Sequence, residues 1–229
     1  MNLLIIVFFF VLLAWVFERF YLRGGRGVSL KIPTDPEIYR IFDSGKEYTP
    51  QRKAVDHTVS DLAGQIKTAL EEHQINTARV VFDSISDNHE YTSEFRPVNA
   101  GGVGSEWVLA PNADPARRVL YIHGGGFIMG CPKSHRTLTS KFSEVSGCAV
   151  LAIDYRLMPE YSHTACIEDC RTAYRWILEN GPAGPGSASQ VFFGGDSAGG
   201  NLALSLAAWI RDERLRAPDA VVAMSPLTD

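Results

Sequence analysis

The fold is decided by Val191-Phe192-Phe193-Gly194-Gly195-Asp196-Ser197-Ala198-Gly199-Gly200, a stretch in the last fifth of this 229-residue sequence. Its apolar first residues predict a short buried strand, and the apolar periodicity that begins at Ala198 predicts a helix. Residues 195–199, between them, fit the pattern G-x-S-x-G, in which a serine stands on a strained turn between a strand and a helix. Gly195, Asp196 and Gly199 would support that turn, because it has little room for bulky neighbours. We therefore expect Ser197 to be a nucleophile; a glycine-rich turn before an ordinary helix is the alternative.

A second glycine-rich motif follows another apolar run upstream. Residues 119–122 predict a buried strand, and His123-Gly124-Gly125-Gly126-Phe127 comes directly after it. Glycines let backbone N–H groups approach a reacting carbonyl oxygen without side chains in the way. The expected donors to a developing oxyanion are therefore the N–H groups of Gly124, Gly125, Gly126 and, next to the serine, Ala198. We expect His123 to hold this loop by hydrogen bonds and not to act as a general base.

From about residue 78 onward, predicted strands alternate with predicted helices. The alternation of strands with helices of ten or more residues indicates crossover connections and a mostly parallel sheet. The further expected strands are residues 80–82, 107–109, 149–153 and 220–224. The expected helices are residues 134–145, 164–179 and 198–211, and residues 181–189 are expected to form a loop.

Composition excludes several classes of function. The net charge is -4, and no basic stripe is interleaved with aromatic residues, so nucleic-acid binding is not expected. Buried or idle thiols are favoured over a disulfide or a metal site, because the cysteines lack zinc-type or redox spacing. These cysteines are Cys131, Cys148, Cys166 and Cys170. We expect neither a metal nor an organic cofactor.

The amino terminus is the main compositional outlier. Residues 3–17 are uninterrupted apolar residues, which approaches the roughly 20 residues that a helix needs to cross a bilayer. We expect residues 1–23 to be an uncleaved membrane anchor and the glycine-rich residues 24–32 to be a hinge. A cleaved signal peptide is the rival, but it would carry a basic start and a small-residue cleavage site. The basic residues that follow the apolar run would place the remaining chain on the cytoplasmic side.

Three motifs, taken together and in this order, resemble those of the hormone-sensitive-lipase-like esterases. They are residues 123–126, then Asp154-Tyr155-Arg156-Leu157-Met158-Pro159-Glu160, then residues 195–200. The resemblance runs from about residue 33 to the last residue. It implies an α/β-hydrolase fold, with a mostly parallel central sheet flanked by helices, a helical cap from residues 33–77 and a core over 78–229. It also implies that Asp154, Arg156 and Glu160 form a structural charge network, and that the substrate is a small ester with a short-to-medium acyl group.

The second half of a catalytic triad is not recognisable in this sequence. In α/β hydrolases the acid and the histidine follow the serine, yet the 32 residues after Ser197 contain no histidine. Their acidic residues are Asp212, Glu213, Asp219 and Asp229. We expect the chain to be a fragment of a longer serine carboxylesterase, truncated after about the sixth strand and inactive alone. The alternatives are a degenerate gene product and a catalytically inactive relative that binds a small hydrophobic ligand; the intact serine and glycine motifs favour the enzyme.

Overall fold

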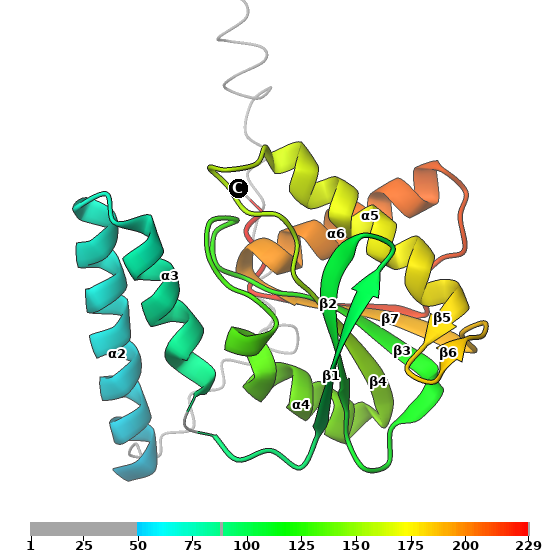
Figure 1. Ribbon diagram of the computed structural model, residues 1–229, viewed down its shortest axis with the longest axis horizontal. Helices are drawn as coiled ribbons and strands as arrows, with labels where there is room; N and C mark the ends of the chain where they lie inside the picture. The colour runs from blue at the N-terminus through cyan, green and yellow to red at the C-terminus, as the bar shows by residue number, and fades with distance from the viewer. Residues whose placement is uncertain (1–49, 88, 229) are drawn as a thin grey trace, which may run out of the picture. The chain divides into compact units, whose positions relative to one another are not determined.

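Residues 50–87 and 89–228 are described by the computed structural model of the chain, and a six-stranded sheet organises them (Figure 1). The strands stand in the order β1-β2-β4-β3-β7-β8. β2 is antiparallel to both of its neighbours, whereas β4, β3, β7 and β8 are parallel to one another. The strands are β1 (Glu94–Ala100), β2 (Val103–Leu109), β3 (Asp114–Ile122), β4 (Cys148–Ile153), β7 (Gln190–Asp196) and β8 (Ala220–Met224). The prediction of a mostly parallel sheet is confirmed.

Helices connect the parallel strands, as crossover connections require. They are α4 (Arg136–Ser146), α5 (His163–Glu179) and α6 (Ser197–Asp212), and a short 3-10 helix (Lys133–His135) precedes α4. Helix α5 begins where the sequence provides an N-cap, because the Ser162 side chain accepts a hydrogen bond from the Ala165 N–H. A small ribbon of β5 (Asn180–Gly181) and β6 (Gly184–Pro185) lies within the stretch that was expected to be a loop.

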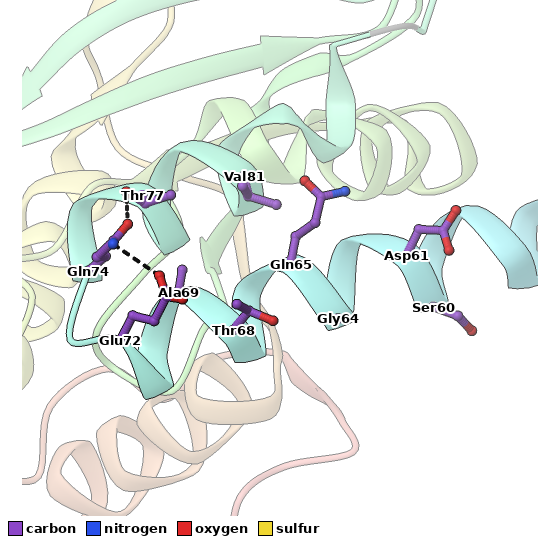
Figure 2. Close-up of a pocket in the computed structure, with 10 residues that line it drawn as sticks. All are labelled: Ser60, Asp61, Gly64, Gln65, Thr68, Ala69, Glu72, Gln74, Thr77 and Val81. Carbon is purple, nitrogen blue, oxygen red and sulfur yellow. Dashed lines mark hydrogen bonds between the residues drawn. The ribbon is translucent and has the colours of Figure 1, made fainter.

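A helical hairpin precedes the sheet. It consists of α2 (Pro50–Glu71) and α3 (Ile75–Asp83), followed by a short 3-10 helix (Ser84–Ser86). The hollow between α2 and α3 has a volume of about 640 Å³ and is lined mainly by polar side chains, such as those of Gln65, Thr68 and Gln74 (Figure 2). It contains none of the residues predicted to carry chemistry.

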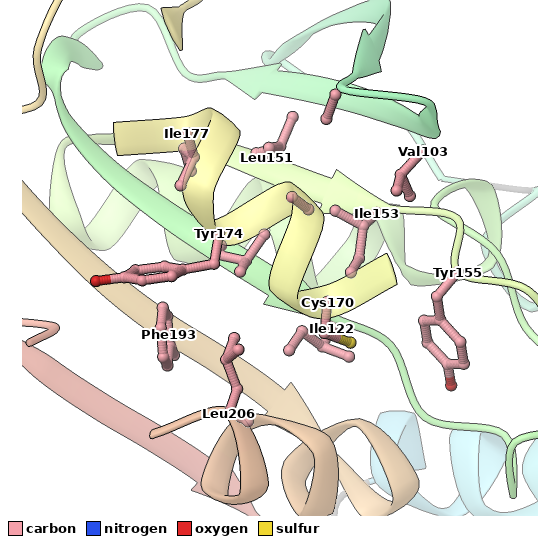
Figure 3. Packing of buried hydrophobic residues seen from close by; sticks show 14 of the residues in the cluster. Val103, Ile122, Leu151, Ile153, Tyr155, Cys170, Tyr174, Ile177, Phe193 and Leu206 are labelled. Carbon is pink, nitrogen blue, oxygen red and sulfur yellow. The ribbon is translucent and has the colours of Figure 1, made fainter. Parts of the chain in front are cut away.

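The core lies on both faces of the sheet, and strand β3 shows how the residues divide. Leu120 and Ile122 pack in a large cluster with α5 and α6, whereas Val119 and Tyr121 belong to a smaller cluster with Phe142 of α4. This alternation follows from the two-residue period of a strand. Figure 3 shows α5 side chains packed among those of the strands in the larger cluster. The buried carboxyl-terminal half of β3 and the buried residues of β7 are held by this packing, which positions the loops that follow both strands.

Most predicted elements lie within observed elements of the same type, with two exceptions. The strand expected at residues 80–82 is wrong, because these residues belong to helix α3, which also runs across the expected boundary between cap and core at residue 78. Strand β1 was not predicted. Its sequence Glu-Phe-Arg-Pro-Val-Asn-Ala contains three polar residues and a proline, which are tolerated because β1 is an edge strand.

The predicted anchor over residues 1–23 and the hinge over 24–32 lie outside the described residues, as does the first part of the predicted cap. None of the helices that residues 50–87 and 89–228 form is both long enough and apolar enough to cross a membrane. The anchor therefore stays a prediction. The four cysteines, all within the described part, are free thiols, and Cys166 and Cys170 share the buried face of α5.

Candidate active site

Ser197 stands at the junction of β7 and α6 in a strained backbone conformation. Its φ is +50°, a left-handed value that is uncommon for a residue with a side chain. The side chain is exposed, and its backbone carbonyl accepts a hydrogen bond from the Leu227 N–H at 3.0 Å. Because Ser197 is the first residue of α6, the unpaired N–H groups of the first helical turn lie beside it. This is the arrangement expected of a nucleophile.

Close packing requires a glycine at position 199, directly after Ala198. A Cβ atom at Gly199 would lie 2.0 Å from the backbone oxygen of Ile122 and 2.5 Å from that of His123. A Cβ at Gly195 would lie 2.5 Å from the Gly199 oxygen. The first turn of α6 therefore packs directly against the end of β3, where the second glycine motif begins.

The loop after β3 is a tight turn around the carbonyl of Gly125. That oxygen accepts hydrogen bonds from the N–H groups of Ile128 at 3.2 Å and Met129 at 3.1 Å. Gly125 has φ +113°, and a Cβ there would lie 2.1 Å from the Met129 oxygen, so only glycine fits. Gly126 and Phe127 also have positive φ values, of +63° and +64°. The conformation of the glycine loop is thus set by hydrogen bonds and close packing within the chain.

Asp196 joins the serine turn to the glycine loop. Its Oδ1 accepts a hydrogen bond from the Tyr121 hydroxyl at 2.8 Å and from the Gly124 N–H at 3.1 Å. The Nε2 of buried His135 lies 3.5 Å from the same oxygen. Burial alone would raise the pKa of Asp196, but these three partners outweigh burial and hold the pKa below its usual range. The carboxylate is therefore an ionised acceptor at neutral pH.

These contacts revise the set of oxyanion donors. The Gly124 N–H is committed to Asp196, so it is not available to a substrate oxygen. Within the described part of the chain, no hydrogen-bond acceptor occupies the N–H groups of Gly125 and Gly126. The N–H of Ala198 lies in the first turn of α6, where backbone donors lack intrahelical partners. Three of the four predicted donors remain.

His123 lies beneath the loop with no direct path to a substrate. It is 1% exposed, its Nδ1 is 2.7 Å from the Gly124 oxygen, and its ring stacks on Tyr155 at 4.2 Å. The Tyr155 hydroxyl donates to the His123 carbonyl at 2.9 Å. Burial, assisted by nearby His135, lowers the pKa of His123 to about 3, so the ring is neutral. These are the contacts of a structural residue.

The expected charge network of Asp154, Arg156 and Glu160 does not form. Arg156 instead pairs with Asp169, whose Oδ1 lies 2.7 Å from Nη2 of the guanidinium. Glu160 pairs with Arg79 of α3 at 2.7 Å. Among the described residues, no ion pair includes Asp154, and burial raises the pKa of its carboxyl. Asp169 lies 13 residues from Arg156, in the Glu168-Asp169 segment that also resembles the family, whereas Arg79 lies 81 residues from Glu160, where no local pattern indicates the pair.

No general base for Ser197 is found in the described part of the chain. All six histidines lie there, and none is within hydrogen-bond distance of the Ser197 hydroxyl. The residues described also contain no cluster of three or more side chains suited to a metal ion.

Comparisons with known proteins agree with this geometry. Residues 119–229 match a family described as "alpha/beta hydrolase fold". The chain is 42% identical over 132 residues to an acetyl-hydrolase of Streptomyces hygroscopicus. The matched region covers 58% of this chain and 42% of that protein. It is also 37% identical over 179 residues to the esterase LipI of Mycobacterium tuberculosis. That matched region covers 78% of this chain and 52% of LipI.

Solved structures resemble the chain over a wider range. The structure of an esterase from the bacterial hormone-sensitive lipase family superimposes with a TM-score of 0.65 at 30% identity, over 80% of this chain and 60% of that chain. The present chain spans about half or less of the length of the curated relatives named above. The chain has an α/β-hydrolase fold, and it is similar to the esterases of the hormone-sensitive-lipase family.

Proposed function

We propose that Ser197 is the nucleophile of a carboxylic ester hydrolase that works through an acyl-enzyme. The observation that carries the proposal is the exposed serine, with φ +50°, at the first turn of α6 and beside a preformed glycine loop. A strained residue persists only when its surroundings hold it, and such strain clusters at active sites. The similar proteins are named acetyl-hydrolase and esterase, which supports the same class of reaction.

In the proposed reaction the Ser197 hydroxyl oxygen attacks the ester carbonyl carbon, and the carbonyl oxygen becomes negatively charged. As the carbonyl re-forms, the bond from carbon to the alcohol oxygen breaks and the alcohol leaves with the proton taken from Ser197; water then releases the carboxylic acid from the acyl-enzyme in the same way. The N–H groups of Gly125, Gly126 and Ala198 would bind that oxygen, while the positive end of the α6 dipole favours the charge. A single oxyanion donor typically contributes about 10²–10³-fold to kcat. Because these groups are already oriented, little reorganisation would accompany the reaction.

Removal of the serine proton needs a base, and the base needs an acid to orient it. We propose that a histidine and a carboxylate from outside residues 50–228 supply these functions. The support is chemical: His123 is buried and neutral, and His135 faces Asp196 instead of Ser197. Neither can take the role without a rearrangement of the core.

For the substrate we propose an ester with a short-to-medium acyl group. An apolar hollow of about 520 Å³ is lined by Ile66 and Leu70 of α2, Phe82 of α3 and Met129 of the glycine loop. We propose that this hollow, formed in part by the hairpin, provides an apolar binding surface for the substrate.

A further part of the proposal, resting on sequence alone, is attachment to a membrane through residues 1–23 with the catalytic domain on the cytoplasmic side.

Labelling with a fluorophosphonate tests the role of Ser197 in the full-length protein. The expected result is covalent labelling and p-nitrophenyl acetate hydrolysis, with Ser197→Ala losing both. Ser187→Ala, which removes a surface serine that donates to Glu179, is the matched control and should behave as the parent. A folded protein that is neither labelled nor active would contradict the enzyme and favour an inactive relative that binds a hydrophobic ligand.

A further inference from the structure

Arg79 of helix α3 contacts the glycine loop from outside the sheet. Its Nε donates to the Ile128 oxygen at 2.7 Å, and its Nη2 donates to the Met158 oxygen at 2.9 Å. The two Nη atoms also bind both carboxylate oxygens of Glu160, at 2.8 and 2.7 Å. With its side chain only 20% exposed, the guanidinium is a fixed brace between the hairpin and two loops.

The contact with Ile128 is transmitted to a proposed oxyanion donor through two peptide groups. The carbonyl of Ile128 and the N–H of Met129 belong to one planar peptide, and that N–H donates to the Gly125 oxygen at 3.1 Å. The Gly125 carbonyl in turn shares a planar peptide with the N–H of Gly126. Since the C=O and N–H of a trans peptide point in opposite directions, fixing the Gly125 oxygen also fixes the direction of the Gly126 N–H.

A second route leads from Arg79 to the same loop. The Met158 N–H donates to the Phe127 oxygen at 2.9 Å, and the Met158 oxygen accepts from Arg79. Arg79 therefore holds the carbonyl of Met158, and the N–H of Met158 holds the Phe127–Ile128 peptide. The two routes together brace the loop on both sides of Ile128.

We propose that Arg79 is a positioning residue that holds the Gly126 N–H in place through the Ile128–Met129 and Gly125–Gly126 peptides. A cation at one end of a chain of hydrogen-bonded dipoles also polarises that chain, which strengthens the donor at the other end. Lysine cannot reproduce the brace, because it is a point charge without the planar fork of arginine. The inference rests on the proposed function for its effect on catalysis, but the brace itself does not.

Ester hydrolysis by the full-length protein, expressed per fluorophosphonate-titrated Ser197, tests the catalytic consequence. Arg79→Gln should lower kcat about 10–100-fold and leave KM within about twofold. This loss of kcat is no larger than the loss expected when one oxyanion donor is removed completely. Arg79→Lys should give an intermediate kcat. The inhibition constant of phenylboronic acid, whose tetrahedral adduct places an oxygen in the same hole, should rise in parallel with the loss of kcat. A variant that only loses stability would keep the parent kcat per titrated serine.

Amide hydrogen exchange in residues 125–130 tests the brace without turnover. Arg79→Gln should speed exchange there about tenfold, whereas Arg96→Gln should not, although Arg96 also binds both carboxylate oxygens of a glutamate, Glu94, through Nε and Nη2. Unchanged exchange in Arg79→Gln overturns the proposal, and so does parental kcat in an active protein. Faster exchange in a protein that hydrolyses no ester would support the brace and overturn the proposed function instead.

Discussion

Acid should destabilise the fold between about pH 6.5 and pH 3, because His123 has to stay neutral in the folded state. The ring is 1% exposed, its Nε2 has no hydrogen-bond partner among residues 50–87 and 89–228, and burial lowers its pKa to about 3. In the unfolded chain the same ring has a pKa of about 6.5. Between these two values the unfolded state binds one more proton than the folded state, so the free energy of unfolding decreases as the pH falls.

The size of the effect follows from the difference between the two pKa values. One pH unit corresponds to about 1.4 kcal/mol for a single proton. At pH 4.5, two units below the unfolded pKa, His123 should therefore remove about 2.7 kcal/mol of stability relative to pH 8. That loss is a substantial part of the roughly 5–15 kcal/mol that stabilises a typical domain.

Urea unfolding at pH 8.0, 6.0, 5.0 and 4.5, monitored by tryptophan fluorescence, measures this contribution. His123→Asn can keep a donor near the Gly124 oxygen but cannot be protonated, so its free energy of unfolding should fall less steeply with pH than the parent's. Other titrating groups cancel in the difference between the two proteins. His163→Gln, which removes an exposed histidine, is the matched control. An identical pH slope for parent and His123→Asn would refute the reasoning, as would an NMR titration of the folded His123 ring near pH 6.5.

Two substitutions test the packing around the site by urea unfolding. Gly199→Ala should cost at least about 3 kcal/mol or prevent folding, because its Cβ would lie 2.0 Å from a backbone oxygen of β3. Gly64→Ala in α2 should instead stabilise by up to about 1 kcal/mol, because its Cβ would meet no described atom within 4 Å beyond its own turn of helix. Equal effects at the two glycines would be inconsistent with the packing. Asp169→Ala should cost about 2 kcal/mol, because it removes a buried acceptor of three hydrogen-bonding nitrogen atoms of Arg156. Asp212→Ala removes a surface pair and should change stability by no more than about 0.5 kcal/mol, so a cost as large as that of Asp169→Ala would contradict this assignment.

The meeting of the two glycine motifs could be predicted from sequence because it depends on strand direction. Each motif follows a short apolar run, and parallel strands end at the same edge of a sheet. In the structure β3 and β7 are adjacent, with Ile122 opposite Gly195, so the two loops start side by side. The chain between the two motifs runs from β3 through α4 to β4 and then through α5 to β7, and these are the two crossovers that this direction requires.

The errors have a common physical origin in contacts between residues distant in sequence. Residues 80–82 are two valines and a phenylalanine, which favour a strand locally, but the hairpin places them in a helix whose Val80 is 71% exposed. Arg79, one position earlier, binds carbonyl groups 49 and 79 residues away. Periodicity reports only which face of an element is apolar, so it contains no signal for such a brace.

Asp196 shows why the hydrogen bonding of the predicted oxyanion donors could be described only from the structure. Four N–H groups are equivalent in the sequence pattern, yet the carboxylate between the two motifs takes one of them, that of Gly124, as a structural donor. The same carboxylate accepts from Tyr121 of β3, so the serine turn and the glycine loop are bound to each other and to the sheet. In the reaction proposed above, a rigid joint of this kind favours the remaining donors, because preorganised dipoles stabilise charge without reorganising. The variable position of G-x-S-x-G therefore acts, in this chain, on the loop 72 residues upstream.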